Sequence, residues 1–321
     1  MKKRAVAVLE NGQIGDVDAA NLRRFIEEQI YSLPGTTRHR QDFSILLSGS
    51  RATGTASPTS DVDIDVLCPQ SVYEAVHRAA HESGLIAAEH SFFHLVPGDD
   101  YGRYFGADLG RPHFSLLSLE EVERQFRDYD DVWLWIWTNA QVITDPAGRF
   151  RRIVEGFIGY PPDLLLRKIK YRWLLAAYWE VEVYPHHSSR DQDLLPACTG
   201  LLNGVNELCR FFFLVEGKPF PYTEKLLATA RRETKLGAEF YPMLQRVVDL
   251  VVGNVEVEAA VWDRLREACD LLIAGDHSPE CQRLEEACAR AMLDAGVDRT
   301  WVKADFNNIG ELLTGKLGPM P

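Results

Sequence analysis

One stretch of the sequence, residues 43–67, limits the possible folds more than any other part of the chain. Residues 43–47 form an apolar run with a single serine, which predicts a buried strand. Residues 62–67 begin with alternating apolar and acidic side chains, which predicts a second strand. Because residues two apart on a strand point to the same face, Asp61, Asp63 and Asp65 are expected to lie together. The chain is therefore expected to contain a sheet with a row of carboxylates on one face.

The length and composition indicate a folded protein of about two domains. Of the 321 residues, 46% are apolar and 26% are charged, close to the ~45–50% and ~25% of ordinary globular proteins. The six cysteines include no C-x-x-C pair, so we interpret them as buried thiols. The sequence contains neither a secretion signal nor an apolar stretch of ~18 residues, so we expect a cytoplasmic protein with no membrane partner.

The net charge is negative and unevenly distributed. Lys and Arg total 35 and Asp and Glu total 47, giving −12. This sign opposes binding to a phosphate backbone, so neither DNA nor long RNA is expected as a partner. Residues 1–150 carry 14 basic and 22 acidic groups (−8), and residues 151–321 carry 21 and 25 (−4). The more acidic first half favours a cationic substrate over an anionic one.

The hydrophobic pattern changes near residue 147. Before it, expected strands and helices are mixed, with further strands expected at 91–96 and 114–119. After it, helical periodicity dominates. The expected helices there span residues 164–184, 194–215, 221–232, 240–252, 257–274 and 279–293. We predict an α+β fold, with a mixed β-sheet and helices in a domain over residues 1–147 and an all-α helical bundle domain over residues 148–321.

Two smaller motifs in the second half have structural interpretations. His186 and His187 follow Pro185 and are interpreted as loop residues rather than metal ligands, because they lack a third ligand at ordinary spacing. Asp191 and Asp193 precede the apolar run that starts at Leu194. They are expected at a helix N-terminus, where acids complement the helix dipole.

The segment between the two expected strands combines small residues with carboxylates. Gly49 has no Cβ, so backbone amide groups there can approach a triphosphate closely, and Ser50 adds a hydroxyl donor. A loop of ten residues, 51–60, follows. Asp61 and Asp63 can together bridge two Mg²⁺ ions ~3.5–4 Å apart. The segment therefore predicts a site for phosphoryl-type chemistry.

The combination resembles the signature of the nucleotidyltransferase superfamily, typified by DNA polymerase β and the antibiotic nucleotidyltransferases. That signature is Gly-Ser, a spacer and then Ser-Asp-x-Asp. It falls here on Gly49, Ser50, Ser60, Asp61 and Asp63, and Arg51 and Gly54 also agree with the usual pattern of the family. The resemblance implies that an NTP binds through the Gly-Ser loop and two Mg²⁺ ions. An acceptor hydroxyl then attacks the α-phosphorus and pyrophosphate leaves. The residues that the resemblance assigns are Asp61 and Asp63 as catalytic metal ligands, and Gly49, Ser50, Arg51 and Ser60 for nucleotide binding.

The third catalytic position departs from the pattern of the family. Relatives usually place another carboxylate on a later strand, where it binds a metal or takes the proton of the acceptor hydroxyl. Here the expected position falls on His113, and an imidazole can act as a general base or bind a metal. Asp65 is a second candidate for this position, although it lies further along its strand and fits a hydrogen-bonded structural acid as well. Further acidic candidates are Asp99, Asp100 and Asp108.

The second half adds a more diffuse resemblance. Residues 211–225 look like part of a branch of bacterial nucleotidyltransferases with a helical C-terminal domain. In such enzymes the acceptor binds between the domains, which makes Tyr222 and Lys225 candidates to line that cleft. Lys225 is also a candidate partner for an oxygen of the triphosphate, and we count it among the nucleotide-binding residues.

Together these observations predict a cytoplasmic, Mg²⁺-dependent nucleotidyltransferase. Its expected partners are an NTP, with ATP favoured, and a hydroxylated small molecule of an aminoglycoside-like kind. Two different functions stay open. One is that of a catalytically silent relative that binds a nucleotide or a partner protein in the manner of an antitoxin, which His113 in place of an acid favours. The second is that of an enzyme that transfers the nucleotide to a protein side chain.

Overall fold

The chain folds into two compact units, Met1–Ile158 and Gly159–Pro321. The computed structural model describes residues 13–15, 17–57, 60–84, 102–105, 112–252 and 279–297. A mixed sheet with helices comes first and a largely helical region follows, which confirms the predicted fold class. The sequence pattern placed the domain boundary at residue 147, before α7 (Arg149–Gly156). In the structure α7 packs on α5 (Leu119–Arg127), and the division into units comes after it.

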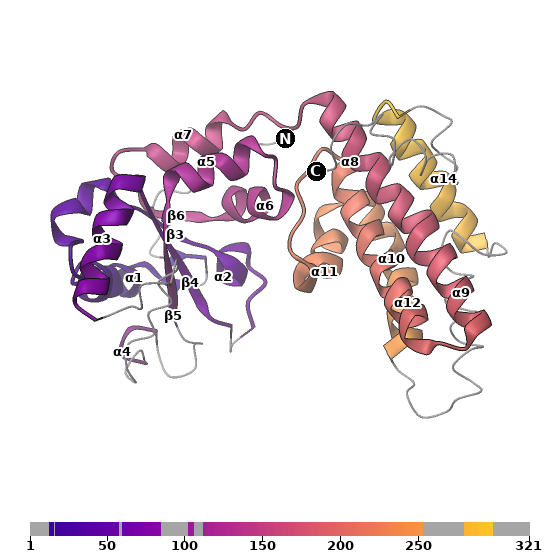
Figure 1. Cartoon of the computed structure of the whole chain (residues 1–321), viewed down its shortest axis with the longest axis horizontal. Coiled ribbons are helices and arrows are strands. Elements are labelled where there is room, and N and C mark those ends of the chain that lie inside the picture. The colour runs from indigo at the N-terminus through magenta and orange to yellow at the C-terminus, as the bar shows by residue number, and fades with distance from the viewer. Residues whose placement is uncertain are drawn as a thin grey trace. The chain divides into compact units, whose positions relative to one another are not determined.

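The first unit holds all the strands of the described chain (Figure 1). Apart from α5 and α7, its elements are, in order, β1 (Gln13–Ile14), β2 (Val17–Asp18), α1 (Ala19–Phe25), the π-helical turn η1 (Ile26–Ile30), the 3-10 turn η2 (Thr37–Asp42), β3 (Ser44–Leu47), α2 (Gly49–Thr53), β4 (Val62–Cys68), α3 (Gln70–Glu82), α4 (Gly102–Phe105), β5 (Pro112–Ser118), α6 (Asp131–Asn139) and β6 (Gln141–Thr144). The strands expected from residues 43–47, 62–67 and 114–119 correspond to β3, β4 and β5. The strand expected at 91–96 lies outside the described residues.

Four strands form the main sheet, in the order β5-β4-β3-β6. β3 is antiparallel to β4 and β6, whereas β4 and β5 are parallel. In the parallel pair, Asp63 lies beside His113 and Asp65 lies beside Ser115. The register thus brings the acidic strand next to the strand that carries His113.

One face of this sheet belongs to a continuous apolar core. Val62, Ile64 and Val66 of β4 are at most 1% exposed, and they pack in one cluster with residues of α1 and α3. In the view of Figure 1, α1 and α3 flank the strands on one side, and α5, α6 and α7 run above them. Because side chains alternate along a strand, Asp63 and Asp65 lie on the opposite face.

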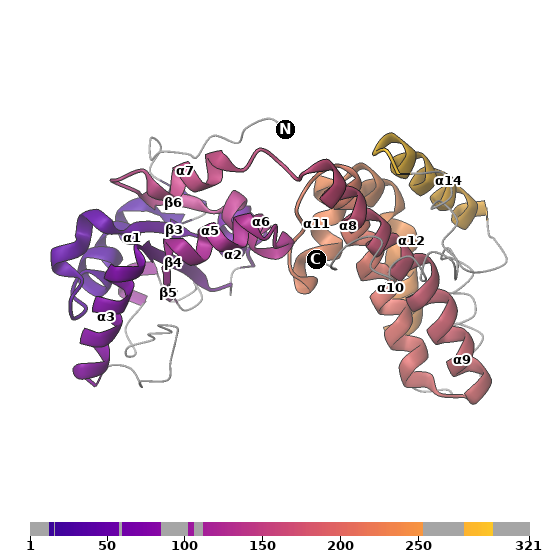
Figure 2. The same ribbon diagram turned by 45° about the horizontal axis from the view of Figure 1, so that its top comes forward.

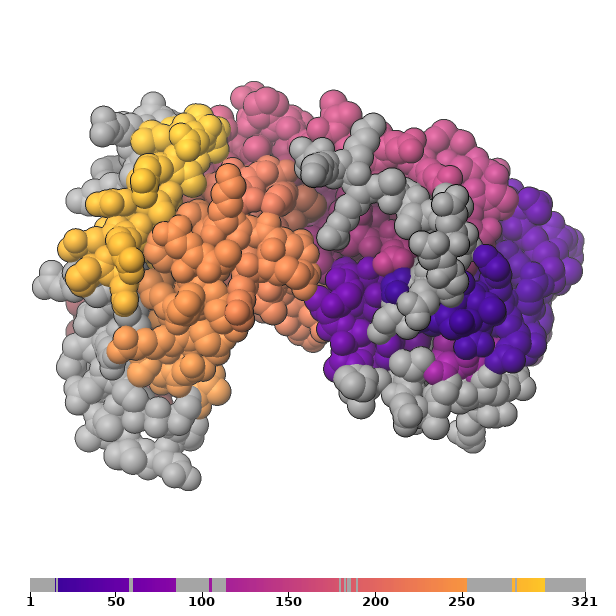
Figure 3. All heavy atoms as spheres, turned by 180° about the vertical axis from the view of Figure 1, so that it is seen from behind, coloured from indigo at the N-terminus to yellow at the C-terminus, as the bar shows by residue number. Residues whose placement is uncertain are grey.

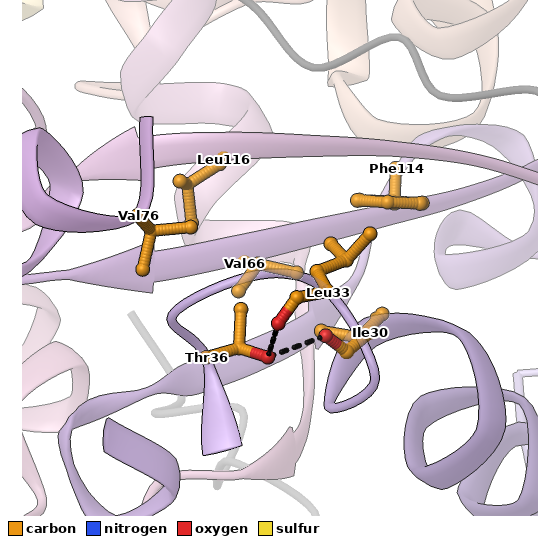
Figure 4. Close-up of a pocket in the computed structure, with 7 residues that line it drawn as sticks. All are labelled: Ile30, Leu33, Thr36, Val66, Val76, Phe114 and Leu116. Atoms are coloured by element: carbon orange, nitrogen blue, oxygen red, sulfur yellow. Dashed lines mark hydrogen bonds between the residues drawn. The ribbon is translucent and has the colours of Figure 1, made fainter. Parts of the chain in front are cut away.

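A small apolar gap lies within the core face. Figure 4 shows its lining residues, Ile30, Leu33, Thr36, Val66, Val76, Phe114 and Leu116. The buried hydroxyl of Thr36 donates to the carbonyl oxygens of Ile30 at 3.0 Å and Leu33 at 2.8 Å. This polar group is therefore satisfied within its own turn. The gap is separated by the sheet from the carboxylates of β4.

The second unit is helical throughout its described part. Its elements are α8 (Pro162–Leu174), the π-helical segment η3 (Leu175–Val183), α9 (Tyr184–Asp191), α10 (Leu194–Val215), α11 (Thr223–Glu233), α12 (Lys235–Val252) and α14 (Pro279–Asp294). Figure 2 shows α10 beside α8 and α12, and Figure 3 shows orange residues of α12 next to the yellow helix α14. The helix expected at 257–274 lies outside the described residues.

The loop predicted for His186 and His187 is wrong, because both residues lie on α9. Pro185 is the second residue of this helix, which follows the π-helical segment η3 directly. The prediction for Asp193 is confirmed, since it caps α10 and accepts from the backbone N–H of Leu195 at 3.3 Å. Asp191 instead ends α9. Of the described helices, none is both long enough and apolar enough to cross a membrane.

Candidate active site

The turn after β3 directly contacts the carboxylate of Asp63. Gly49 begins α2 with a φ of +64°, a left-handed conformation that glycine adopts without strain. A Cβ on Gly49 would lie only 2.0 Å from Oδ2 of Asp63, so no larger residue fits without movement. The backbone N–H of Ser48 also donates to the carbonyl oxygen of Asp63, at 2.9 Å. The Gly-Ser turn and the acidic strand therefore form one site.

Part of the segment expected as a loop is a short helix. In α2 the hydroxyl of Thr53 donates to the carbonyl oxygens of Gly49 and Ser50, both at 3.1 Å. Arg51 is 1% exposed and donates through Nε and Nη2 to the carbonyl oxygen of Ser60, at 3.1 and 2.6 Å. Arg51 thus holds the end of the loop just before Asp61. A direct contact of Arg51 or Ser60 with a nucleotide stays a prediction.

The two acids assigned to metal binding differ in exposure. Asp61 precedes β4 and is exposed, whereas Asp63 lies within the strand and is half-buried. Between them Val62 is buried in the core of the other face. Burial of the apolar side chains thus holds β4 in the core, while the acidic side chains on the other face remain available for chemistry.

Asp65 is held by two hydroxyl groups. Ser115 on β5 donates through Oγ to Oδ1 of Asp65 at 2.5 Å, and the side chain of Ser48 also hydrogen-bonds this carboxylate. Burial raises the pKa of Asp65 above its ordinary value, while the hydrogen bonds from Ser115 and Ser48 act in the opposite direction. Asp65 therefore has the surroundings of a hydrogen-bonded structural acid, one of the two interpretations open from the sequence.

His113 holds the place beside Asp63 in the parallel pair of β4 and β5. This backbone position agrees with the strand register from which His113 was chosen as the third catalytic residue. The side chain of His113 lies outside the described part of the structure, as do Asp99, Asp100 and Asp108. The catalytic role of His113 stays a prediction.

Lys225 and Tyr222 belong to the second unit. Tyr222 directly precedes α11, and Lys225 lies in the first turn of that helix, with its backbone N–H donating to the carbonyl oxygen of Tyr222 at 3.0 Å. Both residues are partly buried. Their contacts with a nucleotide or an acceptor stay predictions.

The residues of the first unit suit a divalent cation that arrives with its nucleotide. The described residues contain no group of three His, Cys, Asp or Glu side chains that could hold a metal alone. Mg²⁺ needs no such group, because it is commonly held by one or two carboxylates together with substrate phosphates and water. Asp61 and Asp63 are the carboxylates that could hold such a cation, and the backbone of Gly49 lies directly against Asp63.

Three supporting residues were not identified from the sequence. Ser48 and Ser115 contact Asp65, as described above. Gln141, the first residue of β6, accepts from the backbone N–H of Gly15 at 2.8 Å and donates to the carbonyl oxygen of Ala52 at 2.7 Å. Only the position of Ser48 next to Gly49 offered a local signal for any of them.

Comparison with known proteins agrees with this geometry. Residues 35–183 match the family model of the nucleotidyltransferase domain. No curated protein matches the chain. A solved structure, the nucleotidyltransferase-like protein from Exiguobacterium sibiricum 255-15, is 10% identical, with 93% of this chain and 89% of that chain covered and a TM-score of 0.39.

The site and the sequence match point to the family without help from that distant structural likeness. The matched segment begins before β3 and extends to the end of η3. It includes the turn at Gly49, the acids of β4 and the whole of β5. Residues 35–183 are thus similar to the nucleotidyltransferase domain.

Proposed function

We propose that this chain is a Mg²⁺-dependent enzyme that transfers a nucleoside monophosphate from an NTP, with ATP favoured, to a hydroxyl group of a small molecule. The observation that carries the proposal is the approach of Gly49 to the carboxylate of Asp63. A triphosphate can touch a phosphate-binding turn and metal-binding acids at once only if the two lie within a few ångströms. The match of residues 35–183 to the nucleotidyltransferase domain supports nucleotide transfer in general.

In the proposed reaction the oxygen of an acceptor hydroxyl bonds to the α-phosphorus, and the bond from that phosphorus to the bridging oxygen of pyrophosphate breaks. Gly49 and Ser50 orient the triphosphate through backbone N–H groups and a hydroxyl. Asp61 and Asp63 hold two Mg²⁺ ions, which when bound neutralise phosphate charge and activate the hydroxyl. His113 takes the proton of the acceptor hydroxyl, which a neutral imidazole can do near pH 7.

Three further residues complete the proposed nucleotide site. Arg51 and Ser60 keep the loop before Asp61 in place through the paired hydrogen bonds between them. Lys225 pairs with an oxygen of the triphosphate, where an ammonium group acts as a point charge.

The proposed acceptor is a cationic hydroxylated molecule of an aminoglycoside-like kind. The charge of −8 over residues 1–150 supports this choice, because a negative field raises the local concentration of a cation. The same field opposes a polyanionic acceptor such as a nucleic acid.

A second candidate function is nucleotide or partner binding without catalysis. The observation that favours it is the place of His113 beside Asp63, where the resemblance expects a carboxylate. An imidazole is a poorer ligand than a carboxylate for a hard cation such as Mg²⁺. Transfer to a protein side chain is a further variant of the enzymatic proposal.

The test is a transfer assay with each α-³²P-labelled NTP and Mg²⁺. The acceptors are aminoglycosides, neutral sugars, amino alcohols and protein. We expect label from ATP to appear on an aminoglycoside, and Asp61→Asn to lower the rate about 10²- to 10⁴-fold, as loss of a metal ligand does. The matched control is Asp128→Asn, which removes the same charge from an exposed acid that accepts from Arg124 at 3.2 Å. It should leave the rate unchanged.

Three results would contradict the proposal or part of it. No transfer to any acceptor, combined with tight NTP binding in calorimetry, would support the catalytically silent function. Label on protein would support transfer to a side chain, and label on neutral sugars alone would contradict a cationic acceptor.

A further inference from the structure

Asp65 connects three segments that meet at the site. Its carboxylate accepts from Ser115 on β5 at 2.5 Å and hydrogen-bonds the side chain of Ser48, the residue directly before Gly49. Ser48 is 6% exposed and is also bound through its backbone N–H to the carbonyl oxygen of Asp63, at 2.9 Å. The residue that starts the Gly-Ser turn is thus attached to β4 at two points.

We infer that Asp65 is a positioning residue that sets the Gly-Ser turn against Asp63 for binding of the triphosphate. The inference rests on the proposed function, since it concerns the same nucleotide site. The contact between Gly49 and Asp63 leaves no space for a Cβ, so a small movement of the turn changes this distance directly. Asp65 fixes the turn through Ser48, and Ser115 fixes the orientation of Asp65.

The hydrogen bonds distinguish this role from direct metal binding. A carboxylate that ligates Mg²⁺ must direct its oxygens to the metal. Both hydrogen bonds of Asp65 come from the two flanking segments, one from Ser115 and one from Ser48, and they stabilise the carboxylate in its place between β3 and β5. Because a serine hydroxyl can either donate or accept, an asparagine at this position keeps both partners.

The first unit contains a matched control of the same chemistry. The hydroxyl of Ser44, at the start of β3, donates to Oδ1 of Asp145 at 2.7 Å. Ser44 is 2% exposed, and it lies at the opposite end of β3 from the Gly-Ser turn. Loss of this bond removes a partly buried serine–aspartate contact from the same unit without touching the site.

The experiment compares Asp65→Asn, Asp65→Ala, Ser48→Ala and Ser44→Ala in the full chain. For each variant we would measure kcat, KM for ATP, Tm, and the Kd of the Mg²⁺ complex of adenosine 5′-(α,β-methylene)triphosphate. Asp65→Ala and Ser48→Ala should raise KM and Kd about tenfold or more, because small misplacements of binding groups weaken productive binding steeply. Asp65→Asn should stay within about threefold of wild type, since its hydrogen bonds persist. Ser44→Ala should lower Tm without changing KM or Kd.

Each alternative role of Asp65 predicts a different result in this experiment. If Asp65→Asn lowers kcat by orders of magnitude, Asp65 is a catalytic ligand and the inference is wrong. If Asp65→Ala and Ser48→Ala match Ser44→Ala, with a lower Tm and unchanged KM and Kd, the contact is only structural. Should Asp65→Ala fail to fold, Ser48→Ala decides alone. A wild-type chain that neither binds the analogue nor transfers a nucleotide would overturn the proposed function, and this inference with it.

Discussion

The two faces of the main sheet are built from the same strands but differ in burial and in polarity. On one face Val62, Ile64 and Val66 are buried in a continuous apolar core. On the other face Asp63 meets the Gly-Ser turn, and Asp65 is bound by hydroxyl groups. One face therefore belongs to the apolar core, and the opposite face carries the acids to which we assign the chemistry. Neighbouring residues of β4 should accordingly respond to substitution in opposite ways.

The largest effect is expected for Asp63→Asn on the acidic face. The change keeps the shape of the side chain but removes the charge of one of the two proposed metal ligands, so kcat/KM for nucleotide transfer should fall about 10³-fold or more. The free energy of unfolding should change little. The label-transfer assay and urea unfolding together check this. A variant that transfers at the wild-type rate would show that the acids of β4 are not the metal site.

The neighbouring change Ile64→Ala should give the opposite result. Ile64 is 1% exposed on the core face, and its truncation should lower the free energy of unfolding by about 2–5 kcal/mol through lost burial and a cavity. The value of kcat/KM should remain within about threefold at a temperature where the variant is folded. Urea unfolding measures the first effect. A selective loss of activity in folded Ile64→Ala would mean that the two faces are coupled.

Gly49→Ala tests whether activity depends on the close approach of the turn to Asp63. The new Cβ would meet Oδ2 of Asp63 at 2.0 Å, so the turn or the acid must move, and activity should fall about 10- to 100-fold. The matched control is Gly54→Ala, because Gly54 has a φ of +69° but nothing within 4 Å of its Cβ position. Both variants carry backbone strain of about 1 kcal/mol, and only Gly49→Ala should also lose nucleotide affinity. Equal losses would assign the effect to strain alone.

The smallest expected effect concerns pH and a thiol on the core face. Burial, with smaller contributions from Glu120 and Asp42, raises the pKa of Cys68 from 9.0 to about 12. The thiol therefore ionises in the unfolded chain before it does so in the folded one, and stability falls as the pH rises from about 9 to 12. At pH 10 this amounts to roughly 1.4 kcal/mol.

Cys68→Ala should remove that part of the pH dependence, whatever its effect on stability at pH 7. Urea unfolding at pH 7 and pH 10 gives the difference. Cys198→Ala, which removes a partly exposed thiol, serves as the control and should change the pH dependence less. The same loss between pH 7 and 10 in wild type and Cys68→Ala would contradict the burial of this thiol.

Local sequence patterns were sufficient for the elements that carry the site. The alternation in residues 62–67 predicted β4 because Val62, Ile64 and Val66 are buried on one face. The limits of α10 followed from Asp193 at its start and from Gly217, with a φ of +66°, just beyond its end. Gly49 and the acids were found because their residue types and spacing are themselves chemical requirements.

Contacts between distant segments could not be predicted from those patterns. Ser115 and Asp65 are 50 residues apart, and nothing in either strand alone indicates that they pair. The error at His186 and His187 has a different origin, since the expected helix ended at residue 184, whereas the helical structure continues to Asp191. Sequence patterns thus found the acids and the glycine of the candidate site but not the side chains that hold them.

The side chain of Gln141 has a consequence for the order in which the protein forms during synthesis. It joins Gly15, 126 residues earlier, to Ala52, 89 residues earlier, so neither contact can exist until β6 has left the ribosome. Contacts over such separations form late, because the intervening chain must first be closed into loops. The hydrogen bonds that join the N-terminal hairpin and the end of α2 to β6 therefore form only after a strand that is made much later.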